Sequence, residues 1–401
     1  MTTEWTGLAE TVKKLTASIK SELDRVNDDF HNTLNGARPL KFNGIGSSGD
    51  DPVEYSVELS DVLFWHDPTG YLDELERWQN QSLIDQYQEV KDYLEETDQN
   101  TSFSRLVEAI KRKRIVPFIG AGLSFSCDYP LWEQAITKLA KKLEGVSTSE
   151  TRAMQPALSY LEEVKQYIVS SKYLDAVQLL YENNKTQVDN FINNTFDGAD
   201  AKDISGPIKL LPAICDGCII TTNFDGLIEK VFQQKHKAIE GYMHGIQTHN
   251  QFAAKLIQGD RCLLKLHGHY NSPETYIFSR EQYAEAYGDQ QIDYTKPLAK
   301  VLRQIFISHS MLFLGCSLEQ DRTTDLFSDI ITTGAFDIPR HFALMPEIKD
   351  HQEKLEKETK LLDTKIQPIW YQVLLDDDGR EDHSQLELMI KFAIACAEGK
   401  L

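Results

Sequence analysis

The chain has 401 residues, of which 41% are hydrophobic and 26% charged, as expected for a globular protein of two or three domains. Its formal net charge of −20 counts against nucleic acid as a partner of this chain alone, because binding a nucleic-acid backbone requires a positive surface. No apolar run approaches the roughly 18 residues that cross a membrane, and the first residues do not read as a secretory signal, so we expect no membrane partner and a cytoplasmic location.

Residues 1–104 are predicted to form a mainly helical region. Apolar residues recur at three- and four-residue steps over 3–36, and a helical pattern returns over 71–96. The polar, glycine-rich stretch 43–52 is predicted to be a loop, and 57–65 fits either a strand or a helix. This region contains no chemical cluster, so its expected role is assembly or contact with a partner.

From residue 105 to 401 the pattern is that of an α/β domain. Short apolar runs alternate with helical segments, which is typical of a Rossmann-like parallel sheet with crossover helices. A helical insertion is expected over about 145–210. The predicted strands lie at residues 115–119, 217–221, 261–266, 311–314, 341–345 and 366–373.

Polar residues follow four of these predicted strands at their carboxyl ends. The segments are Gly120-Ala-Gly-Leu-Ser124, Thr222-Asn-Phe-Asp225, Leu266-His-Gly268 and Gly315-Cys-Ser317. Ligands bind at the carboxyl edge of an open parallel sheet. Each segment alone is a weak signal, but the ordered set predicts one nucleotide site.

The first segment is a glycine turn between a strand and a helix. Gly120 and Gly122 allow the backbone to approach a diphosphate closely, and Ser124 adds a hydroxyl donor. The dehydrogenase fingerprint G-x-G-x-x-G is not met, because Phe125 occupies the third glycine position. A simple packing turn is the alternative interpretation.

The second and third segments carry side chains suited to catalysis. Asn223 can hold a carboxamide or orient a water, and Asp225 either fixes those donors or caps the following helix. His267 can accept a proton from a sugar hydroxyl, although a lone histidine is more often structural. We expect the other nearby histidines, His244 and His269, to be solvated or locally hydrogen-bonded.

The fourth segment repeats the strand–glycine–hydroxyl pattern. Gly315 and Ser317 therefore predict a second phosphate or ribose contact. After the first glycine turn, Pro130 and Trp132 either wall the pocket or belong to the core.

A metal site is not expected. Cys215 and Cys218 are the only close pair among six cysteines, and no second pair or histidines follow at zinc-binding spacing. Buried, reduced thiols are the simpler interpretation.

The ordered motifs resemble those of the sirtuin family, specifically its prokaryotic sirtuin-like NAD-hydrolase branch of antiviral defence effectors. The resemblance rests on residues 116–124, 221–225, 265–268 and 314–318 and covers roughly 105–375. It implies a sirtuin-like fold and an NAD glycohydrolase that cleaves its substrate NAD to nicotinamide and ADP-ribose. It implies no metal.

The resemblance also assigns roles to residues. Asn223 and Asp225 would arrange the nicotinamide ribose, the carboxamide and the attacking water, and His267 would act as the base on the ribose hydroxyls. Gly315 and Ser317 would contact the adenosine side. The implied NAD contacts are Gly120, Ala121, Gly122, Ser124, Thr222, Gly315 and Ser317.

Two departures from protein-deacylating sirtuins count against a deacylase. The four-cysteine zinc module is missing, and the glycine turn continues as Asp128-Tyr-Pro-Leu-Trp132 instead of Pro-Asp-Phe-Arg. The reaction that the resemblance still implies is cleavage of NAD with water as the acceptor.

A helical extension before the domain resembles sirtuin-like proteins that assemble into rings and partner a HerA-type ATPase, so a homo-oligomer and such an ATPase are expected partners. Two alternatives stay open. One is an NAD- or ADP-ribose-binding assembly module without turnover. The other is a nuclease subunit of the same kind of complex, for which the local argument is the basic run Lys111-Arg-Lys-Arg114. That run otherwise reads as the solvated end of a helix beginning near Ser104.

Overall fold

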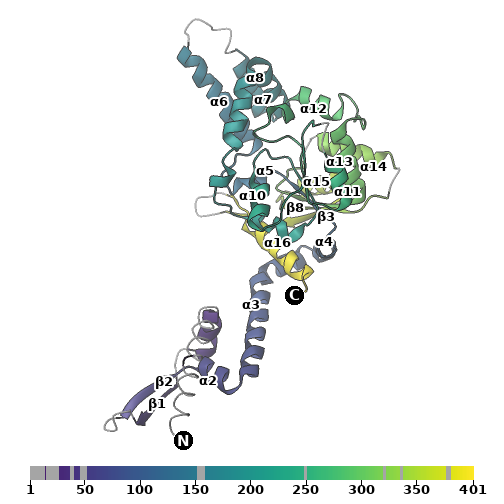
Figure 1. Cartoon of the computed structure of the whole chain (residues 1–401). Coiled ribbons are helices and arrows are strands. Elements are labelled where there is room, and N and C mark those ends of the chain that lie inside the picture. The colour runs from purple at the N-terminus through teal and green to yellow at the C-terminus, as the bar shows by residue number, and fades with distance from the viewer. Residues whose placement is uncertain are drawn as a thin grey trace. The chain divides into compact units, whose positions relative to one another are not determined.

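The computed structural model describes residues 14, 27–36, 40–45, 52–150, 159–247, 251–318, 322–334, 337–375 and 381–401 (Figure 1). The chain divides into two compact units, one ending at Gln88 and the other running from Glu89 to Lys400. The second unit therefore begins earlier than residue 105, the start expected for the α/β domain. Helix α4 (Asn100–Lys111) also begins before Ser104.

The first unit combines helices with a β-hairpin. Residues 27–35 are helical, and the rest of the helix predicted over 3–36 lies outside the described residues except for Lys14. Strands β1 (Leu40–Ile45) and β2 (Pro52–Val57) pair antiparallel. Helices α2 (Leu59–His66) and α3 (Pro68–Glu96) follow, so the ambiguous stretch 57–65 is almost entirely helical.

The prediction of a loop over 43–52 is wrong at both ends, because residues 43–45 and Pro52 belong to strands. Cross-strand pairs hold the hairpin: Phe42 stacks on Tyr55 with ring centroids 5.4 Å apart, and Lys41 pairs with Glu54 at 3.0 Å. Both contacts join a residue of β1 to a residue of β2. The glycine-rich composition of residues 43–52 therefore does not reveal the hairpin.

In the second unit, seven described strands form a parallel sheet in the order β5-β6-β4-β3-β7-β8-β9. The strands are β3 (Ile115–Ile119), β4 (Cys218–Thr221), β5 (Gly241–His244), β6 (Cys262–Lys265), β7 (Ser310–Leu314), β8 (His341–Pro346) and β9 (Ile366–Tyr371). Helices separate most of them along the chain, which confirms the predicted Rossmann-like fold with crossover helices. A second, two-stranded pairing joins β10 (Leu374–Leu375) to β11 (Glu381–Asp382).

The edge strand β5 is missing from the sequence prediction. The inner strands β3, β4 and β6 are buried at every residue, because a parallel sheet is covered on both faces. In β5, buried Met243 follows Tyr242, which is 39% exposed. An edge strand with this alternation lacks the continuous apolar run that marks the others.

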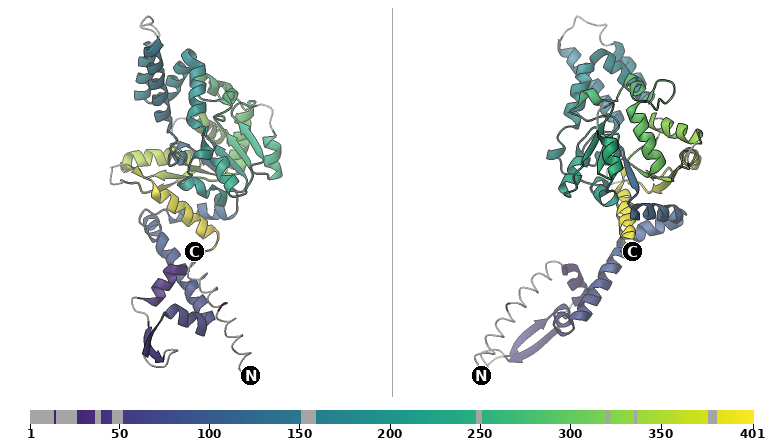
Figure 2. Two further views of the ribbon diagram at one scale, coloured as in Figure 1. Left: turned by 60° about the vertical axis from the view of Figure 1, so that its left-hand side comes forward. Right: turned by 45° about the vertical axis from the view of Figure 1, so that its right-hand side comes forward.

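Three long helices lie between β3 and β4 in the chain, together with shorter helical turns. They are α6 (Trp132–Glu150), α7 (Ser159–Val169) and α8 (Tyr173–Phe196), and they pack together beside the sheet (Figures 1 and 2). A core of their own includes Leu139, Val164 and Leu180. This helical layer overlaps the insertion expected over about 145–210 and starts earlier, at Trp132.

The remaining helices connect and cover the strands. Helices α4 and α16 pack through Phe103 and Phe392, whose rings stack at 5.3 Å. The other elements are α5 (Ala121–Phe125), η2 (Ala199–Ala201), η3 (Pro207–Leu210), α9 (Leu211–Ile214), α10 (Leu227–Gln234), α11 (Phe252–Gln258), η4 (Pro273–Thr275), α12 (Arg280–Tyr287), α13 (Pro297–Ser308), α14 (Arg322–Thr332), α15 (His351–Asp363) and α16 (Ser384–Ala397).

Glycines let the loops after β3 and β7 approach closely. The Gly122 N–H donates to the Gly315 carbonyl at 3.0 Å. A Cβ on Gly120 would lie 2.3 Å from that same carbonyl oxygen. Gly315 has a φ of +66°, and a Cβ there would lie 2.5 Å from the Leu123 nitrogen. The glycine turn is therefore also a packing turn, and both atoms that would clash belong to the backbone.

We expect Gly120→Ala and Gly315→Ala each to lower the free energy of unfolding by about 1–3 kcal/mol or more, because rigid backbone cannot move away from the added methyl. Urea denaturation measures the change. Gly217→Ala is the control, since a Cβ there meets no described atom within 4 Å. Equal urea midpoints for all three variants would contradict the packing argument.

Candidate functional site

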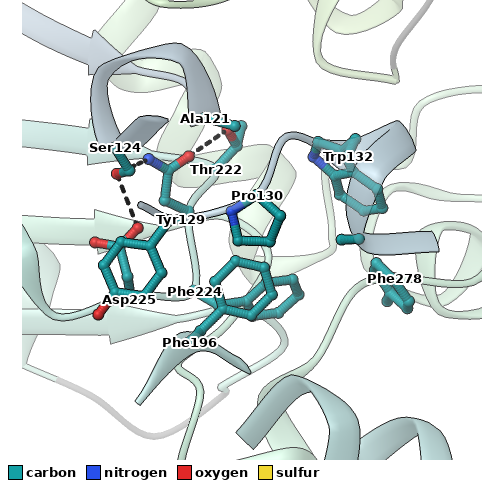
Figure 3. A pocket seen from close by; sticks show the side chains of 12 residues that line it. Ala121, Ser124, Tyr129, Pro130, Trp132, Phe196, Thr222, Phe224, Asp225 and Phe278 are labelled. Atoms are coloured by element: carbon teal, nitrogen blue, oxygen red, sulfur yellow. Dashed lines mark hydrogen bonds between the residues drawn. The ribbon is translucent and has the colours of Figure 1, made fainter. Parts of the chain in front are cut away.

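A cavity opens at the carboxyl ends of β3 and β4 (Figure 3). About 360 Å³ of space not filled by protein atoms lies there, including open solvent at the mouth. Four polar side chains line it, those of Ser124, Thr222, Asn223 and Asp225. The rest of the lining is apolar or aromatic: Ala121, Tyr129, Pro130, Trp132, Ala135, Phe196, Phe224 and Phe278. Pro130 and Trp132 thus belong to the wall, one of the two alternatives drawn from the sequence.

A chain of hydrogen bonds links the β3 turn to the β4 loop. The Asn223 amide nitrogen donates to the Gly120 carbonyl at 3.1 Å and to Ser124 Oγ at 2.9 Å. The Ser124 hydroxyl in turn donates to Asp225 Oδ2 at 2.9 Å (Figure 3). All three side chains are buried. The two loops therefore form one hydrogen-bonded unit, although their residues lie about a hundred positions apart.

This arrangement fixes the orientation of Asn223. The Gly120 carbonyl can only accept, so the amide nitrogen must face it. The carbonyl atom Oδ1 receives one long contact, 3.4 Å from the Thr222 hydroxyl. Oδ1 is thus the atom of Asn223 with hydrogen-bonding capacity left for a ligand or a water.

Asp225 accepts hydrogen bonds from the β3 turn and from the start of α10, whose N-cap is the next residue, Gly226. Its Oδ2 accepts from Ser124, while Oδ1 accepts from the Leu227 N–H at 3.0 Å at the start of α10. Burial raises the pKa of Asp225, and the charge of Lys265 opposes that rise.

Lys265 is the functional candidate that the sequence analysis missed. Its side chain is fully buried, and its ammonium contacts the carbonyls of Phe224 and Asp225 and the Glu229 carboxylate. The sequence analysis includes it in the predicted apolar strand 261–266. The available signal was the charge itself, since a lysine in a buried strand requires partners.

His267 directly follows β6 and lies outside the cavity lining. It is 2% exposed, its Nε2 lies 2.8 Å from the Tyr283 hydroxyl, and its ring meets Trp132 edge-on at 5.5 Å. Burial lowers the pKa of His267 to about 4, against an opposing effect from the Thr222 backbone. The imidazole is therefore neutral at pH 7. Trp132 contacts both this ring and the cavity.

The structure does not bring all predicted NAD contacts into the cavity. Ala121, Ser124 and Thr222 line it, whereas Gly120 and Gly122 pack against the loop after β7. Gly315 belongs to that packing contact. Ser317 is exposed, and its carbonyl accepts from Lys357 at 2.7 Å.

Of the two other histidines, His269 follows the sequence expectation and His244 does not. Their rings stack at 5.2 Å beside Lys265 and Glu229. His269 keeps a local bond to Asn271, as expected. The expectation is wrong for His244, whose Nε2 is buried without a hydrogen-bond partner among the described residues.

Among the described residues, no group of three or more histidine, cysteine or carboxylate side chains is arranged to hold a metal. All six cysteines are described and are free thiols. None of the described helices combines the length and the apolar character needed to span a membrane.

Comparison with known protein families agrees with this geometry. Residues 217–369 match the SIR2-like domain family. The matched segment begins just before β4 and includes Thr222, Asn223, Asp225, Lys265 and His267. The strand β3 and its glycine turn precede it.

Several curated proteins resemble the chain over more than half its length. The NAD(+) hydrolase ThsA of Bacillus cereus (strain MSX-D12) is 23% identical over 239 residues, covering 60% of this chain and 44% of that protein. The NAD(+) hydrolase ThsA of Enterococcus faecium is 25% identical over 251 residues, covering 63% and 47%. Defense-associated sirtuin 2 of Bacillus subtilis is 25% identical over 219 residues, covering 53% and 19%. The chain spans less than half the length of these relatives.

A solved α-L-fucosidase superposes with a TM-score of 0.20 at 11% identity, over 73% of this chain and 98% of that one. This likeness is too weak to inform the fold.

The neutral His267 makes the free energy of unfolding depend on pH. In the unfolded chain an ordinary histidine binds a proton below about pH 6.5, whereas folded His267 does so only near pH 4. The free energy of unfolding should therefore fall as pH drops from 6.5 to 4, by up to about 1.4 kcal/mol per pH unit.

The variant His267→Gln removes this titration and keeps a polar partner for Tyr283. Urea denaturation between pH 7 and 4.5 should show a shallower pH dependence than in the wild type. The exposed His351→Gln serves as the control. An unchanged slope in His267→Gln would contradict a buried, neutral imidazole.

Proposed function

We propose that the chain is an NAD glycohydrolase of antiphage defence, which cleaves NAD to nicotinamide and ADP-ribose. The observation that carries this proposal is the bonded set Asn223, Ser124 and Asp225 beside an aromatic cavity at the carboxyl edge of the sheet. The SIR2-like domain and the similarity to proteins named NAD(+) hydrolase and defense-associated sirtuin support it.

The chemistry suits these residues. Breaking the bond between ribose and nicotinamide releases a neutral base and leaves an oxocarbenium-like sugar, which a water then attacks. Such a site needs to orient the ligand and stabilise positive charge. The rings of Trp132, Phe224 and Phe278 offer flat surfaces for nicotinamide. Asn223 Oδ1 can accept a hydrogen bond from the carboxamide, a ribose hydroxyl or the water.

We assign His267 to the ribose hydroxyls as the base, since its imidazole is neutral at pH 7. Its Nε2 is engaged by Tyr283, and Trp132 packs against its ring. In this proposal Trp132 moves aside when NAD binds, and the ribose hydroxyl replaces that of Tyr283 at Nε2.

The diphosphate would bind along the β3 turn, at Gly120, Ala121, Gly122 and Ser124. Strand β3 lies between β4 and β7. A dinucleotide with its nicotinamide end over the β4 loop can therefore reach the loop after β7. This geometry supports the proposed contacts of Gly315 and Ser317 with the adenosine side.

We further propose that residues 1–104 mediate homo-oligomer assembly or contact with a HerA-type ATPase, in the cytoplasm. Large apolar side chains are exposed in the hairpin and in α2, which supports a contact role. They include Phe42 (54%), Val53 (43%), Tyr55 (41%) and Trp65 (46%).

The function is tested by incubating the protein with NAD, alone and with the proteins encoded beside it, and quantifying nicotinamide and ADP-ribose by chromatography. We expect Asn223→Ala to lower turnover at least about 100-fold, because it removes both the Ser124 contact and the free acceptor Oδ1. Asn183→Ala is the matched control, since that exposed amide bonds only to its own helix in α8.

Wild-type turnover in Asn223→Ala would overturn the mechanism. If calorimetry shows that NAD or ADP-ribose binds but no product forms even with the neighbouring proteins, the chain is a binding module and not an enzyme.

A further inference from the structure

We propose that Lys265 is a positioning residue of the NAD-cleaving site, whose buried ammonium fixes the backbone of the loop that carries Asn223 and Asp225. This inference rests on the proposed function. It adds a residue that does not line the cavity and does not touch the ligand.

Lys265 lies at the carboxyl end of β6, directly opposite Thr221 in the register of β4. From there its side chain reaches the loop that follows β4. The ammonium lies 3.4 Å from the Phe224 carbonyl and is hydrogen-bonded to the Asp225 carbonyl. Its third partner is Glu229 Oε1 in α10, at 2.8 Å. The three N–H donors of the lysine thus meet three acceptors.

Space filling alone does not explain a charge at this position. Lys265 is 0% exposed, and apolar residues of similar volume usually replace a buried ion pair without loss of stability. An apolar side chain, however, removes the lysine donor from the Asp225 carbonyl and leaves the Phe224 carbonyl with the Tyr270 N–H, at 3.1 Å. What the lysine supplies beyond packing is therefore the orientation of these two peptide groups.

The surroundings keep the lysine paired with Glu229. His244 and His269 stack beside the pair, and His269 Nε2 lies 3.7 Å from Glu229 Oε1. Burial and then the Lys265 charge lower the pKa of both histidines, that of His244 to about 4. The lowered pKa values disfavour the protonated imidazoles that would compete with Lys265 for the carboxylate.

The loop transmits the lysine's position to the hydrogen-bonded set. Phe224 and Asp225 directly follow Asn223, and Asp225 also binds the Ser124 hydroxyl that accepts from Asn223. A shift of the two carbonyls therefore moves the side chains of Asn223 and Asp225, which hold Ser124 between them. Displacements of about 1 Å in a catalytic site can cost about 100-fold in rate.

The double variant Lys265→Met/Glu229→Met tests the proposal, because it removes the ammonium without stranding a buried carboxylate. We expect it to fold, with a melting temperature below that of the wild type because two backbone carbonyls lose the lysine donor. Its kcat for NAD should fall about 100-fold while KM changes little, because the glycine turn on β3 is untouched. Hydrogen exchange should become faster at the amides of residues 222–227.

Lys237→Met is the control. That lysine also bonds a carbonyl, of Pro212, and pairs with Asp216, but it contacts neither loop of the cavity. It should keep the kcat and the exchange rates of residues 222–227. If the first double variant does not fold, Lys265→Gln/Glu229→Gln replaces it, since the shorter amide cannot reach both carbonyls.

A folded double variant with wild-type kcat and wild-type exchange overturns the positioning role. Failure of the proposed function looks different: the wild type then releases no nicotinamide even with its neighbouring proteins. In that case the exchange rates at residues 222–227 still decide whether Lys265 orders the loop.

Discussion

The parallel pairing of β3 with β4 on one side and β7 on the other determines where the polar groups of this protein meet. In register, Ile119 lies opposite Thr221 and Leu314, so three loops leave the sheet at the same edge. Residues a hundred positions apart, such as Ser124 and Asp225, thereby come within hydrogen-bonding distance. The glycines of the β3 and β7 loops are a consequence of this proximity, because the two backbones touch where a Cβ would stand.

Much of the fold could be predicted from the sequence because burial on both faces leaves a local mark. Strands such as β3 and β4 are short apolar runs, and each needs only its own residues to be recognised. The hairpin β1–β2 and the edge strand β5 left no such mark. The hairpin is held by cross-strand side-chain pairs, such as Phe42 with Tyr55. Strand β5 is half exposed, so it has no continuous apolar run.

The same distinction separates the predicted and the missed parts of the site. The polar strand ends identified Ser124, Asn223 and Asp225, which the structure brings together. Lys265 could not be assigned a role, since its carbonyl partners lie in a loop some forty residues earlier. His267 is buried against Trp132, which lies far away in the chain. No local pattern around His267 therefore indicates that it lies outside the cavity lining.

The cavity is lined by residues from before and from within the segment that matches the family model. Thr222, Asn223 and Asp225 belong to the segment that matches the SIR2-like domain family, whereas Tyr129, Trp132 and Phe196 lie before that segment. Tyr129 and Trp132 stand where the chain departs from the deacylase pattern. None of these three aromatic side chains takes part in the hydrogen bonds that hold Asn223. Substitutions at these three positions can therefore change the shape of the cavity, and so the ring that would fit in it. They leave the hydrogen-bonded side chains that would carry out the chemistry unchanged.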